Sequence, residues 1–160
     1  MFSNIQSALV DAQSTATATA MAMHSIKQSN APLFIRSISI LVVDSNEDQA
    51  EMFATLLNIY GHDVVCVSTG LEALASARQR NFEVIYICSS SAKIAPFELV
   101  EKLKTFRHLA DTFFVAMSGH AGLSYRTSAL KVGFNYVVVK PAGIGDLCAP
   151  VIDKANKLSK

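Results

Sequence analysis

Five side chains capable of chemistry follow apolar runs of this sequence, at points where buried strands would end. Asp44 and Ser45 follow the first run, Cys88 ends the third, and Ser118 and Lys140 follow the fourth and fifth. An ammonium group close to a thiol lowers the pKa of the thiol and increases its reactivity. One hypothesis is therefore a redox-sensitive or modifiable Cys88. A second is that Cys88 is a small, buried hydrophobic residue, and a third is that it becomes a phosphocysteine.

These side chains can meet only if the runs before them form neighbouring strands. The runs are short and apolar, and segments with apolar residues three or four positions apart separate them. The pattern predicts five strands, at 37–43, 63–67, 82–88, 112–117 and 136–139. It predicts helices at 47–60, 71–80, 96–106, 123–132 and 144–158, the last one interrupted or delayed by Pro150.

Five alternating strand–helix units indicate an α/β fold, a flavodoxin-like doubly wound (βα)5 arrangement with a five-stranded parallel sheet. Nearly continuous apolar strands are typical of a parallel sheet that helices cover on both faces. Ligand chemistry in such sheets takes place at the carboxyl ends of the strands. The side chains of Asp44, Cys88, Ser118 and Lys140 are therefore expected along one edge of the sheet.

The composition argues against several classes of function. The chain has 160 residues, 51% of them hydrophobic, which suits one well-filled core. A formal net charge of +1 favours neither nucleic acid nor an anionic membrane as a partner. Three cysteines without CxxC or Cys/His ligand spacing indicate reduced thiols, not disulfides or a metal site. The sequence has neither an apolar run long enough to span a membrane nor an export signal, so we expect a cytoplasmic protein. We also expect no cofactor.

The first 36 residues differ from the rest. They carry only three charged side chains, Asp11, Lys27 and Arg36, and end shortly after a helix-breaking stretch at 30–32. Their apolar residues form a weak, alanine-rich stripe at helical spacing. Residues 1–36 are predicted to be a tail, either disordered or a helix that packs on the domain or pairs with a second copy. The domain itself is predicted to span 37–160.

Six short motifs of this domain, in order, resemble the receiver domain of two-component response regulators. They read ILVVDSN at 40–46, LLNIYGHDV at 56–64, GLEAL at 70–74, FELVEKL at 97–103, MSGHA at 117–121 and GFNYVVVKP at 133–141. The resemblance covers about 37–157 and implies the strand order 2-1-3-4-5. It also implies phosphorelay signal transduction, in which a phosphoryl group moves from a phosphohistidine to an Asp at the end of the third strand.

The resemblance implies a degenerate phosphoacceptor pocket. Asp44 matches the first of two acidic residues that hold Mg²⁺ in the family, Ser45 replaces the second, and Cys88 stands at the acceptor position. Ser118 and Lys140 match the hydroxyl and the lysine that contact the phosphoryl group. Because a thiol and a neutral hydroxyl are poor ligands for Mg²⁺, we expect no metal site. Asp44 would then pair with Lys140 or keep weak cation binding.

The parts that respond to phosphorylation also differ from the family. Val137 stands at the switch position of the fifth strand, where receivers have an aromatic residue, and Tyr136 should face the other side of the sheet. After Cys88, Ala92 and Pro96 replace the usual Pro and Gly. These changes together predict a pseudo-receiver, which keeps the receiver shape without its phosphorylation chemistry.

Other polar residues receive structural interpretations. Ser118 is expected to cap the following helix more readily than to bind a ligand. His62 is expected at the surface and His120 in a solvated loop beside the site. Cys66 and Cys148 are expected to pack in the core or between helices.

The leading hypothesis is a non-enzymatic, stand-alone response-regulator receiver that acts as a phosphorylation-independent signalling adaptor through protein-protein interaction. Its partner would be a kinase, a phosphotransfer protein, another regulator or a second copy in a homodimer. The expected partner face comprises the fourth helix, fifth strand and fifth helix, with Leu123, Tyr136, Val138 and Leu147.

Two further functions are considered. The first is a redox or small-anion sensor that uses the strand-end pocket around Cys88. The second is a flavodoxin-like enzyme or flavin carrier. The sequence DSNED at 44–48, where a Gly- or Ser/Thr-rich phosphate loop would stand, argues against the flavin carrier.

Overall fold

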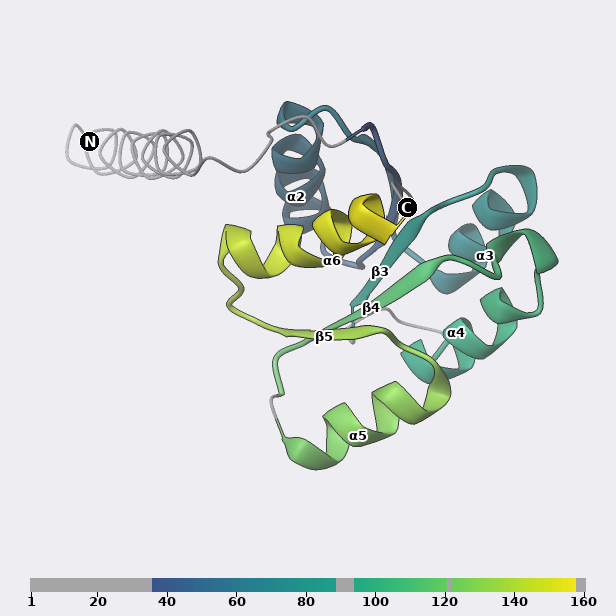
Figure 1. The fold of residues 1–160 in the computed structure, drawn as a ribbon. Helices are drawn as coiled ribbons and strands as arrows, with labels where there is room; N and C mark the ends of the chain where they lie inside the picture. Colours follow the sequence, from purple (N-terminus) through teal and green to yellow (C-terminus); the bar gives the residue numbers. More distant parts are fainter. Residues whose placement is uncertain (1–35, 89–93, 121, 158–160) are drawn as a thin grey trace, which may run out of the picture. The chain divides into compact units, whose positions relative to one another are not determined.

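The structure is a computed structural model, and it describes residues 36–88, 94–120 and 122–157. Five strands alternate with helices in these segments (Figure 1). The strands are β1 (Ser39–Val43), β2 (Asp63–Val67), β3 (Val84–Cys88), β4 (Phe113–Ser118) and β5 (Tyr136–Val139). The helices are α2 (Glu47–Ile59), α3 (Gly70–Gln79), α4 (Pro96–Lys104), the 3-10 turn η1 (Arg107–Leu109), α5 (Leu123–Val132) and α6 (Ile144–Lys157). The predicted tail, apart from Arg36, and Ala92 lie outside the described residues.

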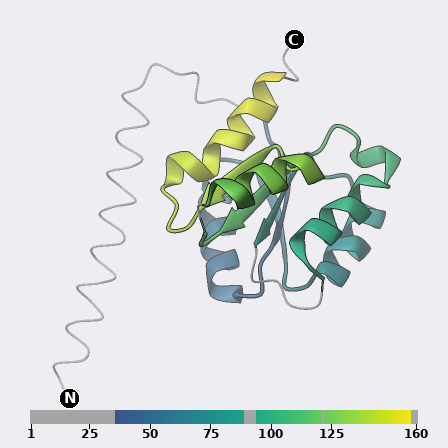
Figure 2. The ribbon, with the colours of Figure 1, turned by 90° about the horizontal axis from the view of Figure 1, so that it is seen from below.

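The sheet confirms the predicted fold class and topology. All neighbouring strands are parallel, and their order is β2-β1-β3-β4-β5. Helices α2 and α6 cover one face, and α3, α4 and α5 cover the other (Figures 1 and 2). The register pairs Val43 with Ile87 and Ser118 with Val139, so the carboxyl ends of these strands meet at one edge of the sheet.

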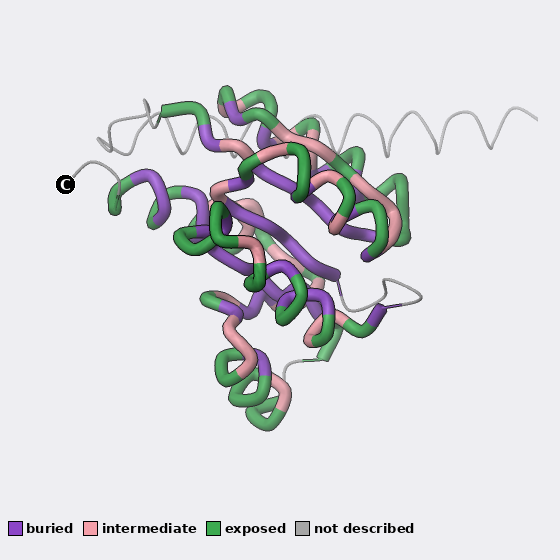
Figure 3. The backbone as a smooth tube through the Cα atoms, turned by 90° about the vertical axis from the view of Figure 1, so that its right-hand side faces the viewer, coloured by how far each residue is buried: buried purple, intermediate pink, exposed green. Residues whose placement is uncertain are grey.

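The core has two parts, one on each face of the sheet. On the α3–α5 side, Leu41, Ile85 and Phe114 pack against Leu99 and other residues of the covering helices. On the α2–α6 side, Val42, Tyr86 and Val115 pack against Phe53 and Val151 of the covering helices. In Figure 3 the central strands form a continuous buried layer, with exposed segments on the outer sides of the helices. Because alternate residues of one strand point to opposite faces, the apolar runs fill both parts of the core.

Helix α6 is continuous through Pro150, which corrects the expected interruption. The helix begins at Ile144, where the side chain of Asp146 accepts a hydrogen bond from the backbone N–H of Gly143 at 3.1 Å. Pro150 lies six residues farther on and is buried. A proline inside a helix removes one backbone hydrogen bond. Here, packing of the buried face of α6 against the sheet outweighs that loss.

The predicted positions of His62 at the surface and of Cys66 in the packed interior were wrong. His62 is buried, and its Nδ1 accepts a hydrogen bond from the N–H of Ile38 at 3.3 Å. The left-handed turn at Gly61 (φ 84°) directs the chain back against the start of β1, which the sequence pattern did not indicate. Cys66 is exposed because β2 is an edge strand.

Candidate functional site

Asp44 is the central acidic group at the carboxyl edge of the sheet. It follows β1, and its backbone N–H donates to the carbonyl of Val67 at 3.1 Å. One carboxylate oxygen, Oδ1, accepts from the N–H of Asn46 at 3.0 Å. Asn46 in turn caps α2 by accepting from the N–H of Gln49. The turn between β1 and α2 therefore fixes the Asp44 side chain, which is only 3% exposed.

Cys88 is the last residue of β3 and lies directly beside Asp44. Its Sγ donates a hydrogen bond to Oδ2 of Asp44 at 2.9 Å, and the residue is buried. Burial, together with the hydrogen bond and negative charge of Asp44, raises the pKa of the thiol to about 12. The ammonium group of Lys140 lowers the pKa of the thiol, but by less than burial and Asp44 raise it. Cys88 is therefore a protonated hydrogen-bond donor near neutral pH, which gives no support to the thiolate sensor.

Lys140 completes a network of four side chains, which also includes Cys88, Asp44 and Gln49. Its Nζ lies 3.2 Å from Oδ2 of Asp44 and 3.0 Å from Oε1 of Gln49. Partial burial alone would lower the pKa of Lys140. The negative charge of Asp44, and that of Cys88 once its thiol ionises, outweigh burial, so the pKa is raised. Asp44 Oδ2 thus accepts from both the thiol and the ammonium group.

Gln49 was not among the predicted site residues. Its position in the first turn of α2, three residues after the Asn46 cap, puts it within reach of the strand ends. The spacing of cap and glutamine was visible in the sequence, but nothing in the sequence indicated that Lys140 would extend toward α2.

The two serines of the predicted pocket, Ser118 and Ser45, differ in exposure. Ser118 is buried, and its Oγ accepts from the N–H of His120 at 3.1 Å. It does not cap α5, whose N-cap is Gly122 without a side-chain hydrogen bond, so that expectation was wrong. The loop places the start of α5 too far along the chain for Ser118 to reach it. Ser45 is exposed and lines an open depression of about 790 Å³ with Gly119 and Lys140.

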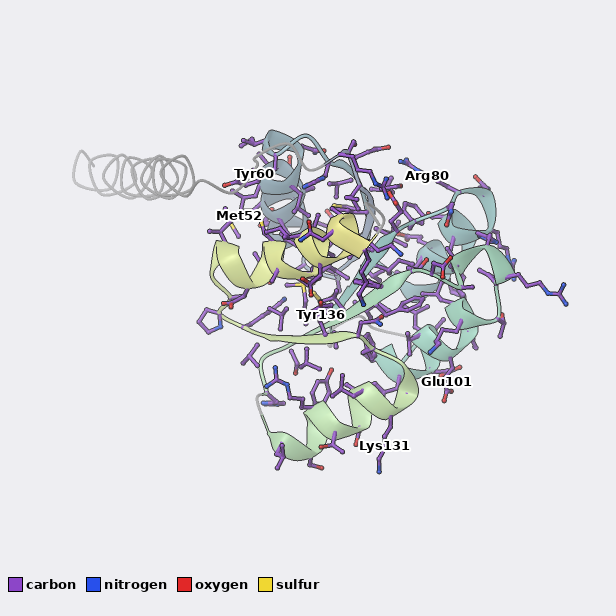
Figure 4. All side chains as sticks on the ribbon, viewed as in Figure 1. Met52, Tyr60, Arg80, Glu101, Lys131 and Tyr136 are labelled. Atoms are coloured by element: carbon purple, nitrogen blue, oxygen red, sulfur yellow. The ribbon has the colours of Figure 1, made fainter. Side chains whose placement is uncertain are left out.

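The residues of β5 alternate between the two faces of the sheet. Val137 is buried with the α3–α5 part of the core, whereas Tyr136 packs against the α2–α6 part. The hydroxyl of Tyr136 donates to Asp153 of α6 (Figure 4 labels Tyr136). Val137 has no polar atom in its side chain, so it cannot form a hydrogen bond with Ser118 or any other group of the site.

The residues of the expected partner face do not share one exposed surface. Leu123 is 80% exposed on α5. Val138, however, is buried beneath α6, and Leu147 packs against the same part of the core. The correction has a simple cause: α6 covers the side of β5 to which Val138 points. The exposed large apolar side chains of α5 are Leu123 and Leu130.

Within the described part of the chain, no three His, Cys, Asp or Glu side chains lie close enough together to hold a metal ion. In the same residues, no helix combines the length and the apolar character needed to cross a membrane. The acidic group nearest to the strand ends, Asp44, is engaged with Cys88 and Lys140.

Comparisons with known proteins agree on one family. Its sequence model, described as the response regulator receiver domain, matches residues 40–152. The transcriptional regulatory protein ZraR of Klebsiella oxytoca is 26% identical over 104 residues, which are 65% of this chain and 23% of that protein. This chain therefore spans about a quarter of the length of that curated relative.

Solved structures show the same fold. The chemotaxis response regulator CheY4 of Vibrio cholerae is 22% identical, with a TM-score of 0.70 over 74% of this chain and 99% of that one. A response regulator from Burkholderia pseudomallei, solved with a phosphorylated aspartic acid, calcium ion and citrate, is 25% identical. Its TM-score is 0.65, and the match covers 75% of this chain and 69% of that one.

Proposed function

We propose, from the premise that this chain belongs to the response regulator receiver domain family, that it signals without being phosphorylated. The family membership rests on the match over residues 40–152 and on the parallel sheet in the order β2-β1-β3-β4-β5. In the proposed function the domain is an adaptor, which transmits a signal by binding another signalling protein.

The observation that carries the proposal is the hydrogen bond from Cys88 to Asp44. An acceptor aspartate at the end of β3 would provide a carboxylate that attacks phosphorus. The thiol at this position is buried, protonated and directed toward Asp44 at 2.9 Å. A protonated thiol is a weak nucleophile. The end of β3 therefore lacks the group that a phosphoryl transfer would need.

The residues of the site do not fit the divalent cation that the family implies. A hard cation such as Mg²⁺ takes carboxylate, carbonyl and water oxygens as ligands. Here Asp44 is the acidic residue at the strand ends, and its Oδ2 already accepts hydrogen bonds from Cys88 and Lys140. The Burkholderia relative was solved with a phosphorylated aspartic acid and calcium. In this chain Cys88 ends β3, where the resemblance to receivers implies an acceptor aspartate.

The adaptor role is supported by the surface of α5. Leu123 and Leu130 are 80% and 50% exposed, and Ala129 is the buried residue of that helix. Leu123 and Leu130 are seven residues apart and therefore lie on one face of α5, so a partner that covers this face would remove both from water. We expect this helix, and not Val138 or Leu147, to contact the partner.

Magnesium titration tests the loss of the cation site. Isothermal titration calorimetry of the full chain should show no Mg²⁺ binding at millimolar concentrations. The double variant Ser45→Asp, Cys88→Asp adds two carboxylates beside Asp44 and should bind Mg²⁺. Adding Val137→Tyr should not change the affinity greatly, because Val137 packs in the core on the α3–α5 side. Millimolar or tighter Mg²⁺ binding by the unmodified chain would contradict the proposal.

Partner capture tests the adaptor role. The full chain and its Cys88→Ala variant should retain the same protein from an extract, because binding does not require the thiol. The variant Leu123→Glu should lose it. Leu71→Glu, which changes a 59% exposed leucine on α3, is the matched control and should retain it. Loss of the partner in Cys88→Ala but not in Leu123→Glu would refute the adaptor surface.

A further inference from the structure

A second cavity lies beside the site, on the face of the sheet that α2 and α6 cover. Its volume is about 440 Å³, within the range of small-molecule sites in proteins. Its walls include Met52 and Phe53 of α2, Met117 of β4 and Leu147 of α6, and its polar end includes Asp44 and Lys140. Figure 4 labels Met52 on α2, near the first turns of α6. The cavity therefore joins an apolar chamber to the Asp44–Lys140 pair.

The walls of this cavity suit an apolar molecule. Phe53 and Met117 are buried, while Met52 is 59% exposed at the cavity. Thioether side chains are flexible and polarisable, so two of them can adapt to ligands of different shape. A ligand that covers Met52 would also remove an exposed apolar side chain from water, which is favourable.

The polar end defines the head group of such a ligand. The Lys140 side chain is 28% exposed, whereas that of Asp44 is 3% exposed. A ligand that reaches this end meets the ammonium group before the carboxylate, and it therefore needs a hydrogen-bond acceptor.

The charges of the cavity favour a neutral head group. Asp44 already balances the charge of Lys140 at 3.2 Å, and the first turn of α2 adds Glu47 and Asp48 nearby. An anionic head would introduce an unbalanced negative charge beside these groups, and a cationic head would face Lys140. Removing an uncompensated charge from water is costly, so both are disfavoured.

We propose that this cavity binds a small, neutral amphiphile. Its apolar body lies against Met52, Phe53, Met117 and Leu147, and its carbonyl or hydroxyl oxygen accepts a hydrogen bond from Lys140. The polar end of this cavity shares Asp44 and Lys140 with the candidate functional site. Binding of the amphiphile needs neither phosphorylation nor the α5 surface, so its test does not depend on the proposed function.

Methionine-methyl NMR of the full chain tests this site directly. The probe is heptanamide, and heptanoate and heptylamine are its matched anionic and cationic analogues. Heptanamide should shift the methyl signals of Met52 and Met117 in a saturable way. Its affinity should exceed that of each charged analogue by about tenfold or more.

Substitutions at the cavity give the second arm of the test. Ala142→Leu adds volume within the lining, and Met52→Gln puts a polar side chain of similar size at an exposed position. Both should weaken heptanamide binding, with Met117 as the common reporter. Ala75→Leu, on the exposed side of α3, is the control and should leave binding unchanged.

Three results would overturn the proposal. The first is the absence of methyl shifts up to the solubility limit of heptanamide. The second is equal affinity for the amide, the carboxylate and the amine. The third is unchanged heptanamide binding by Met52→Gln when its circular dichroism spectrum is normal. Position 52 is exposed, so this substitution should not disturb folding.

Discussion

At the residue scale, one oxygen atom determines the chemistry of the strand ends. Oδ2 of Asp44 accepts hydrogen bonds from Cys88 at 2.9 Å and from Lys140 at 3.2 Å. Burial and this carboxylate together raise the pKa of the Cys88 thiol, and the same oxygen pairs with the ammonium group of Lys140. Asp44 after β1, Cys88 at the end of β3 and Lys140 after β5 form a network that Gln49 extends to α2, which makes the site a structural connection between these elements.

Alkylation should reveal the protonated thiol of Cys88. A pKa of about 12, against an ordinary value of 9.0, lowers the thiolate fraction near pH 8. The expected rate is lower by a factor on the order of a thousand. Peptide mapping after timed iodoacetamide treatment of the folded chain should show Cys66, which is exposed, modified well before Cys88. Equal rates for both cysteines in the native protein would contradict this account, and equal rates in denaturant are the control.

His62 gives a pH dependence at the same scale. Burial lowers the pKa of His62 from 6.5, and its Nδ1 accepts a hydrogen bond that a protonated ring could not accept. Below pH 6.5 the unfolded chain therefore binds more protons at this residue than the folded chain. The stability contribution of neutral His62 is complete above that pH and is lost as the pH falls toward the folded pKa. The slope is at most about 1.4 kcal/mol per pH unit.

Urea unfolding at pH 7.5 and pH 5.5 measures this effect. The variant His62→Asn keeps an acceptor without a titrating ring and should lose less stability between these two pH values than the unmodified chain. His120→Asn changes an exposed histidine of the loop after β4 and is the control. If the unmodified chain and His62→Asn show the same pH dependence, the buried histidine does not contribute as proposed.

At the element scale, a helix or strand could be predicted from the sequence where the spacing of its apolar residues follows one clear pattern. The apolar run before Cys88 and the helical spacing in 47–60 depend only on neighbours along the chain, and both elements were predicted within two residues of their observed ends. Pro150 and His62 were misjudged because their surroundings come from distant segments. Tertiary packing, not local propensity, decides whether a proline is tolerated or an imidazole is buried.

Gly133 ends α5 in a conformation that other residues rarely adopt. Its φ is 121°, and a Cβ at this position would meet the ammonium end of Lys104. The lysine can move, but the backbone strain would remain. Gly133→Ala should therefore lower the free energy of unfolding by about 1–2 kcal/mol in urea titrations.

The matched control for this substitution is Gly145→Ala. Gly145 lies in the first turn of α6, and a Cβ there would meet nothing within 4 Å. Its alanine variant also restricts the unfolded chain. Alanine is favoured over glycine in a helix, so this change should stabilise the chain by about 0.5–1 kcal/mol. Equal effects of both substitutions would mean that the turn after α5 is not strained by a side chain.

At the scale of the whole molecule, the receiver fold and the groups at its strand ends depend on different parts of the sequence. The fold depends on the two parts of the core, which the strands fill from both faces. The site depends on a few groups at the strand ends. Asp44, Cys88 and Lys140 could be placed there because parallel strands end at one edge. The role of Gln49 and the burial of Val138 could not be predicted, since each depends on how α2 or α6 packs on the sheet.

The most direct test of the central claim is intact-mass spectrometry of the full chain after incubation with acetyl phosphate and Mg²⁺. Under the proposed function, neither the buried, protonated Cys88 nor the engaged carboxylate of Asp44 accepts a phosphoryl group. The account predicts an unchanged mass, and it predicts that Ser45→Asp, Cys88→Asp becomes phosphorylated in part. Addition of one phosphoryl group to the unmodified chain in good yield would contradict it.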